Sequence, residues 1–125
     1  MIKVYDSKDI TLEICQDIKK LAKMLGACEA SYVPFIKALR KKDLEECVAI
    51  INGEIGWLVG NSVLPAKFVL NGRMVIYNNY GQARIKSNYL NGVFHGEYEG
   101  YYSLTDGSID VGKVVRYKFK NGNII

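Results

Sequence analysis

A series of two-residue turn signals in the second half of the chain limits its fold more than any other feature. Each signal places an Asn or Asp before a glycine: Asn71-Gly72, Asn91-Gly92, Asp106-Gly107 and Asn121-Gly122. Such dipeptides favour tight hairpins, because a type I′ turn needs positive φ at both of its central residues. The chain beyond Pro65 is therefore predicted to reverse direction repeatedly as an antiparallel β-meander. The predicted strands are 67–70, 74–77, 82–89, 94–102, 108–112 and 115–120.

The first half of the chain carries apolar residues at helical spacing instead. Between residues 8 and 25 they recur at three- and four-residue steps, at Ile10, Ile14, Ile18, Leu21 and Leu25. This spacing predicts an amphipathic helix. Asp9 or Ser7 is expected to cap its start, and Gly26 stands where a left-handed residue would end it.

A second, shorter helix is expected to follow. Phe35 and Leu39 give it a small apolar face. Pro34 is placed in its first turn, because proline breaks a helix interior. The basic run Arg40-Lys41-Lys42 suits the end of this helix, where positive charge complements the helix dipole. A nucleic-acid patch is the less favoured interpretation of that run.

A third helix is predicted from Asp43 onward. Asp43 and Glu46 stand at the spacing of a capping box. The apolar stripe of this helix comprises Leu44, Cys47, Ile51, Ile55 and Leu58. Gly53 interrupts the stripe, so a bend or a stop is expected there. Trp57 lies beside the stripe and is expected to cap the core.

These patterns predict an α+β fold, in which about three N-terminal helices pack on or cap a C-terminal antiparallel β-meander. The helical region is placed at residues 1–64 and the β region at residues 65–125, in one compact unit. Charge divides in a similar way: residues 1–60 hold nine Lys or Arg and nine Asp or Glu, and the rest hold eight and four. The net charge of +4 therefore belongs to the β half.

The N-terminus and the cysteines indicate the compartment. Residues 1–6 lack the apolar run of a signal peptide, and no apolar stretch approaches the ~20 residues that span a bilayer. Cys15, Cys28 and Cys47 form an odd set with no C-x-x-C pair, whereas secreted disulfide frameworks usually hold an even number. We therefore expect a cytoplasmic protein with free thiols and no membrane span.

The turn signals also repeat along the β half. Tyr89-x-x-Gly92 is echoed by Phe119-x-x-Gly122 after 30 residues, and Gly81 is echoed by Gly107 after 26 residues. A period of this length is typical of an array of hairpins. The fullest copy reads Tyr77-Asn-Asn-Tyr80-Gly81, then Asn88-Tyr89-Leu90-Asn91-Gly92-Val93-Phe94-His95-Gly96-Glu97, then Tyr101-Tyr102 and Asp106-Gly107.

This string resembles the bacterial MORN-variant repeat over about residues 68–125. Such repeats read roughly as Tyr, a turn glycine, Tyr-x-x-Gly, His-Gly-Glu and then Tyr-Tyr. The resemblance implies a sheet of stacked hairpins, and similar proteins include a YwqK-like group often labelled as antitoxins of toxin–antitoxin systems. The helical half lies outside the resemblance, and we expect it to cap the exposed first edge of the sheet.

Residue types that carry catalysis or bind metals are sparse. His95 is the only histidine and the cysteines stand 13 and 19 residues apart, so neither a zinc site nor a Cys–His nucleophile is expected. The His-Gly position in the repeat favours a structural role for His95. Glu97 and Glu99 share one face of a strand, where a solvated surface is favoured over acid–base chemistry. We predict that the chain is not an enzyme and needs no cofactor or metal.

The last predicted strand has two different sides. Its side chains alternate, with Arg116, Lys118 and Lys120 on one face and Val115, Tyr117 and Phe119 on the other. One edge of the domain is therefore expected to be basic. Lysine that protects an edge strand is the simplest explanation, and nucleic-acid binding is the alternative.

A non-catalytic protein-binding module is the function that these features favour, such as an antitoxin or an inhibitor of a bacterial or phage defence factor. Tyrosine offers a large contact area at small entropy cost, and cations orient a partner. The predicted partner-binding residues are Tyr98, Tyr101, Tyr102, Arg116, Lys118 and Lys120. The partner is expected to be another protein of unknown identity, and self-association stays open. Nucleic acid bound by the basic last strand is the alternative.

Overall fold

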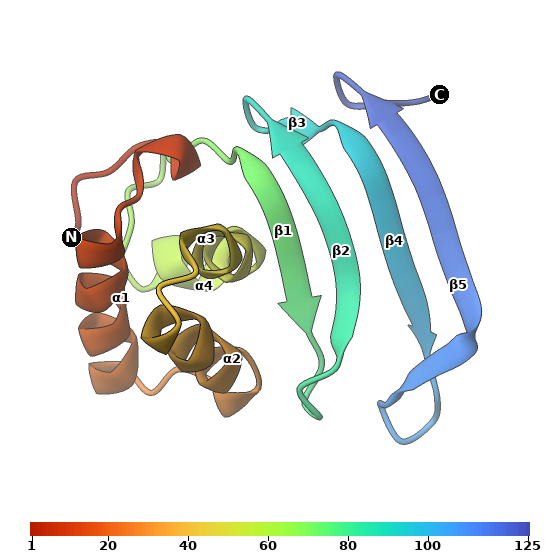
Figure 1. The fold of residues 1–125 in the computed structure, drawn as a ribbon, viewed down its shortest axis with the longest axis horizontal. Coiled ribbons are helices and arrows are strands. Elements are labelled where there is room, and N and C mark those ends of the chain that lie inside the picture. The colour runs from red at the N-terminus through yellow and green to blue at the C-terminus, as the bar shows by residue number, and fades with distance from the viewer.

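The structure is a computed structural model that describes every residue from Met1 to Ile125. Helices come first and an antiparallel sheet follows, as Figure 1 shows. The helical part comprises a 3-10 helix (Ser7–Asp9), α1 (Leu12–Met24), α2 (Glu29–Arg40), α3 (Leu44–Gly53) and α4 (Ile55–Gly60). The sheet comprises β1 (Gly72–Tyr77), β2 (Ala83–Leu90), β3 (Val93–Phe94), β4 (Gly96–Ser103), β5 (Ile109–Lys120) and β6 (Asn123–Ile124). The predicted α+β fold is confirmed.

Helix α1 starts later than the apolar spacing predicts. Thr11 is its N-cap, and the Thr11 hydroxyl accepts a hydrogen bond from Ile14 N at 3.2 Å. Neither Ser7 nor Asp9, the two predicted caps of this helix, caps α1, because both lie in the 3-10 helix that precedes it. Gly26 follows the helix with a φ of +75°, so the predicted left-handed end is confirmed.

Helix α2 contradicts the prediction for Pro34. The helix begins at Glu29, so Pro34 lies in its interior and not in its first turn. Proline there removes one helical hydrogen bond. Burial of Phe35 and Leu39, which are only 4% and 6% exposed, offsets that loss because both side chains enter the core.

Helices α3 and α4 divide where the sequence predicts. The Asp43 carboxylate accepts a hydrogen bond from Glu46 N at 3.1 Å, which caps α3. The helix ends at Gly53, and α4 follows after Glu54. The third predicted helix is therefore two helices. Neither these helices nor α1 and α2 are long and apolar enough to cross a membrane.

One hydrophobic core joins the helices to the first strand. It takes at least one buried side chain from each helix and one from the sheet: Ile18, Phe35, Ile51, Leu58 and Val75. Figure 1 shows the helices grouped beside β1, while β4 and β5 extend away from them. Most of the sheet therefore lies outside the helical core.

Asn52 of α3 ties the helical half to the edge of β1. Its side-chain amide nitrogen donates to Asn71 O at 2.9 Å and to Arg73 O at 2.7 Å. The Ser7 hydroxyl donates in turn to Asn52 Oδ1 at 2.6 Å. These bonds satisfy carbonyls that an uncovered edge strand would leave unpaired.

Gly53 brings the same helix into direct contact with the strand. A Cβ atom at Gly53 would collide with Val75 O, so only glycine allows this approach. Arg73 adds ion pairs from β1 to Glu45 at 3.2 Å and to Glu46 at 3.3 Å. The predicted cap on the first edge of the sheet is therefore present, and α3 forms it.

The strand order is β1-β2-β4-β5-β6, with β3 paired to β2. The Asn-Gly turns at Asn91-Gly92 and Asn121-Gly122 have the predicted type I′ geometry, with φ of 49° and 86° in the first and 50° and 87° in the second. They join β2 to β3 and β5 to β6. Two predicted strands, 108–112 and 115–120, are one long strand, β5.

The other two turn signals behave differently. In Asn71-Gly72 and Asp106-Gly107 only the glycine has positive φ, so neither is a type I′ turn. The predicted strand 67–70 is also wrong, because Val69 makes only an isolated parallel bridge. Its backbone bonds to the N-terminal segment, where Val69 N donates to Tyr5 O at 2.8 Å.

Two hairpin units, 70–93 and 94–123, repeat the same hydrogen bonds. In each unit the turn glycine and the asparagine before it donate to residues that precede the unit's first long strand. These bonds are Gly92 N to Leu70 O (2.9 Å), Gly122 N to Phe94 O (2.8 Å), Asn91 N to Asn71 Oδ1 (2.8 Å) and Asn121 N to His95 Nδ1 (3.2 Å). His95 is therefore the counterpart of Asn71, and its imidazole accepts a backbone hydrogen bond.

Candidate functional site

The sheet has two chemically different faces. Directly paired residues point their side chains to the same face. One face, here called the aromatic face, carries Tyr89, Phe94, Tyr98, Tyr117 and Phe119, in which Tyr89 pairs with Phe94 and Tyr98 with Tyr117. The opposite face, here called the charged face, carries Lys86, Glu97, Glu99, Arg116 and Lys118.

The rings of the aromatic face form one packed cluster. Tyr89 stacks on Phe94 at 4.9 Å between ring centroids, and Phe94 lies 5.1 Å from Phe119. Tyr98 meets Phe94 edge-on at 5.7 Å and lies 5.9 Å from Tyr117. Offset and edge-on pairs of this kind contribute ~0.5–1.5 kcal/mol each beyond their buried area.

One glycine of β4 makes room for a ring of this cluster. A Cβ atom at Gly100 would lie 3.2 Å from the Tyr98 ring, which therefore folds back over the backbone of its own strand. Burial raises the pKa of the Tyr89 hydroxyl, and neighbouring Tyr98 adds to the rise.

No helix covers the aromatic face over β4 and β5. Tyr117 is 43% exposed, and the other four rings are half-buried. A shallow hollow lies beside the cluster, lined by Arg84, Ile85, Tyr98, Gly100, Tyr101, Tyr102, Val115 and Tyr117. The hollow combines aromatic surface, one guanidinium group and exposed tyrosine, which are residue types enriched at protein interfaces.

On the charged face, the cations stand beside carboxylates. Arg116 Nε lies 3.4 Å from Glu99 Oε2, and the Tyr101 hydroxyl donates to Glu99 Oε1 at 2.7 Å. The Tyr101 hydroxyl, followed by Arg116, lowers the pKa of Glu99. Lys118 pairs across strands with Glu97. The expected basic strip is therefore a surface of mixed charge, because β4 supplies acidic residues opposite the basic ones.

The six predicted partner-binding residues do not form one site. Tyr98 and Tyr102 lie at the hollow on the aromatic face, whereas Arg116 and Lys118 belong to the charged face. Tyr101 also lines the hollow, but its hydroxyl donates to Glu99 of the charged face. The remaining residue, Lys120, is exposed and pairs with Asn123 of β6.

Most of the ring cluster lies outside the six predicted residues. The sequence places Tyr89, Phe94 and Phe119 in the repeat motif and Tyr117 on the apolar side of the last strand. The available signal was alternation, because Tyr117 and Phe119 stand two residues apart on the strand face that pairs with Tyr98.

The two edges of the sheet differ. The β1 edge is bonded to α3 through Asn52. The outer edge of β5 pairs with β6 only at Phe119 and Lys120, and Ile125 N adds a bond to Lys118 O at 2.9 Å. Between residues 109 and 117 no strand pairs with this outer edge. An edge of this kind accepts a further strand unless side chains prevent it.

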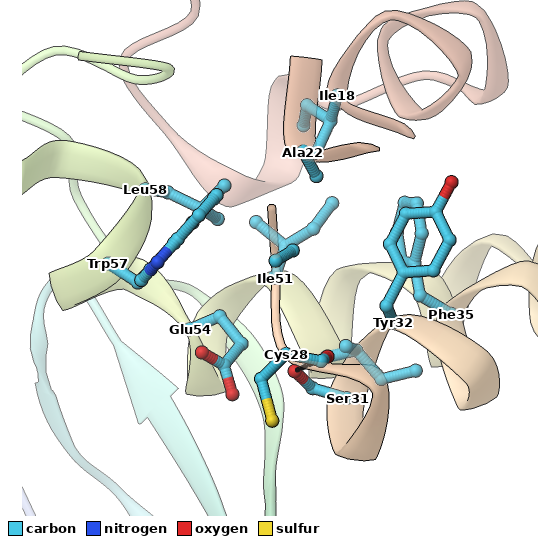
Figure 2. Close-up of a pocket in the computed structure, with 12 residues that line it drawn as sticks. Ile18, Ala22, Cys28, Ser31, Tyr32, Phe35, Ile51, Glu54, Trp57 and Leu58 are labelled. Atoms are coloured by element: carbon cyan, nitrogen blue, oxygen red, sulfur yellow. Dashed lines mark hydrogen bonds between the residues drawn. The ribbon is translucent and has the colours of Figure 1, made fainter. Parts of the chain in front are cut away.

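The helical half holds a second hollow. Its walls come from all four helices, with Ile18 on α1, Phe35 on α2, Ile51 on α3 and Trp57 on α4. Figure 2 shows these side chains around a hollow whose rim carries Glu54, Cys28 and Ser31. The sequence does not predict this pocket, because its residues come from separate helices whose apolar stripes indicate only core packing.

The groups that could act as nucleophiles or ligands are dispersed. Cys15 and Cys47 are buried, and burial raises the pKa of Cys15 to about 12, so this thiol stays protonated. Cys28 is exposed and lies outside the buried core. No three His, Cys, Asp or Glu side chains come together as ligands for a metal ion.

Comparison with known proteins gives this chain no relative. No family model, curated protein or solved structure matched it. The resemblance to MORN-variant repeats therefore rests on the residues of the chain alone.

Proposed function

We propose that the protein is a non-catalytic binding module that contacts another protein through the aromatic face of its sheet. One observation carries the proposal: five packed rings lie on a face that no helix of the chain covers. Water contact with such rings is unfavourable, and a partner that covers them gains hydrophobic energy. The rings are also held rigid by each other, so binding immobilises few side chains.

The binding surface of this proposal is narrower than the sequence predicts. It keeps Tyr98 and Tyr102, adds Tyr117, and leaves the charged face out. The open edge of β5 lies beside it and offers backbone hydrogen bonds to the same partner. We propose in addition that the protein belongs to the MORN-variant group. Its role would be that of an antitoxin or of an inhibitor of a defence factor.

Nucleic-acid binding has less support. Arg116 has a carboxylate partner at 3.4 Å, and Lys118 stands opposite Glu97. A phosphate backbone would meet these carboxylates together with the cations, which weakens the electrostatic attraction that such binding needs.

The test is partner capture with substitutions on the aromatic face. The double variant Tyr102→Ala/Tyr117→Ala should reduce capture of a native-host partner at least about tenfold, because central aromatic residues commonly carry most of the binding energy. Tyr5→Ala is the matched control, since Tyr5 is 54% exposed, compared with 58% for Tyr102, and lies outside the sheet.

Two outcomes would contradict the proposal. One is undiminished capture by a folded double variant, as judged by circular dichroism and thermal midpoint. The other is capture that nuclease treatment removes and that falls steeply with salt, which would support nucleic acid instead.

A further inference from the structure

The hollow among the four helices is apolar on nearly every side. Figure 2 shows Trp57 and Leu58 on one side, Tyr32 and Phe35 on the other, and Ile51 between them. Ile18 and Ala22 of α1 close it from above in that view. Aromatic and branched walls from separate helices suit a compact apolar group, because they contact it from several directions.

One charged side chain belongs to this hollow. Glu54 stands between α3 and α4, where it caps neither helix with its side chain. It is half-buried, and no Lys, Arg or His nitrogen lies within ion-pair distance of its carboxylate. Burial raises the pKa of Glu54, and the nearby Ser31 hydroxyl opposes the rise in part.

The Glu54 carboxylate has no cationic partner in this chain. Partly buried carboxylates are usually paired with a cation or with several hydrogen-bond donors. In this chain the neighbours are the Cys28 thiol and the Ser31 hydroxyl, which carry no charge, and the Ser31 hydroxyl donates to Cys28 O at 3.4 Å. A cation supplied from outside would complete the arrangement.

We propose that this pocket binds a small apolar amine, with the apolar body between Trp57 and Phe35 and the ammonium group at Glu54. The inference is independent of the aromatic face, because the pocket lies in the helices and not on the sheet. The charge on Glu54 selects an amine over a neutral or anionic molecule with the same apolar body, since only the ammonium forms a charge-assisted hydrogen bond with it.

The single tryptophan gives this proposal a direct readout. Trp57 is the only tryptophan in the chain and it lines the pocket, so its fluorescence reports occupancy there. The probes are 2-phenylethylamine, 2-phenylethanol and 3-phenylpropionate, which share a phenyl group and differ in the charge of the polar end. The amine should give a saturable change and bind at least about tenfold more tightly than the other two.

Two variants assign that preference to Glu54. Glu54→Gln keeps the shape of the side chain and removes its charge, so the amine and the alcohol should then bind about equally. Glu13→Gln is the matched control, because Glu13 is exposed in the first turn of α1 and should leave the preference unchanged.

A pH titration of the wild-type chain repeats the test without a substitution. As the pH falls through the pKa of Glu54, the amine should lose affinity while the alcohol does not. The other titratable groups at the pocket are Cys28 and Tyr32, and thiols and phenols do not ionise in acid. The proposal is wrong if the amine gives no saturable signal, if amine and alcohol bind alike, or if Glu54→Gln keeps the preference.

Discussion

Two neighbouring residues stabilise the contact between α3 and β1 in different ways. Asn52 donates hydrogen bonds to carbonyls at the β1 edge, and Gly53 allows the backbone of α3 to approach Val75 O closely. The sequence marks Gly53 only as a helix stop and gives no sign of what Asn52 bonds. Both roles depend on a strand some twenty residues away in sequence, which no local pattern encodes.

Replacing Gly53 tests whether the close approach of α3 to β1 requires glycine. Gly53→Ala should lower the free energy of unfolding by ~1–3 kcal/mol, because the new methyl group forces α3 away from Val75 O. Gly56→Ala is the matched control, since Gly56 lies in α4 with open space around its Cα. Alanine there should stabilise by up to ~1 kcal/mol through helix propensity. Urea unfolding compares the two, and equal effects of the two substitutions would contradict this role.

The charge on Glu54 predicts a pH dependence of stability. Its pKa is higher in the folded chain than the ordinary value of 4.5, so the folded state favours the protonated form. Stability therefore falls as the pH rises through the folded pKa. Glu54→Gln should be more stable than the wild type at pH ~7 and lose this advantage below the unfolded pKa of ~4.3. Urea midpoints at both pH values measure the difference, and a constant offset would argue against it.

The three cysteines should differ in reactivity. In the folded protein, iodoacetamide should label Cys28 alone, because Cys15 and Cys47 are fully buried and burial raises the pKa of both thiols. After denaturation without reductant it should label all three. Intact mass counts the labels, and rapid labelling of three sites in the folded protein would show that the helical core opens.

Among the elements, helices were easier to predict than strand boundaries. The caps at Asp43 and Gly26 are local signals, and both are confirmed. Pro34 was misplaced, because core burial of the residues after it outweighs the preference of proline for the first turn. The run at 67–70 was misread as a strand, because its backbone pairs with the N-terminal segment and not with the sheet.

The turn at Asn91-Gly92 provides a test at the level of the hairpin. Gly92→Val should cost ~1–3 kcal/mol, because a β-branched residue at a φ of +86° is strained. Gly92→Asn should cost less, since asparagine tolerates the left-handed region. Thermal unfolding ranks the two variants, and a valine variant as stable as the wild type would contradict the turn assignment.

Over the whole molecule, the sequence predicts the order of the layers better than it predicts the surface. Helices before a meander follow from periodicity and turn residues, which are local. The predicted site combines residues of both sheet faces, because strand alternation alone does not say which residues of β4 stand opposite those of β5. Pairing of Glu97 and Glu99 with Lys118 and Arg116 is set by register, and the register depends on the whole hairpin.

Repetition of the hydrogen bonds predicts that the sheet tolerates another unit. A second copy of residues 94–123 inserted after Asn123 should fold, because its Asn-Gly turn would donate to the Phe94 and His95 of the copy, as Gly122 and Asn121 do in the present unit. Circular dichroism should show added strand content, and the thermal midpoint should not fall. If the variant no longer unfolds in one cooperative transition, the added unit does not stack on the sheet as the native units do.

The two edges of the sheet differ in whether a further strand can pair with them. At β1 the sheet is anchored, since Asn52 and Gly53 of α3 fit closely against that strand. At β5 the same backbone pattern is still open. Hairpin units can therefore be gained or lost at the β5 end of the sheet during evolution, but not at the β1 end, where α3 covers the edge.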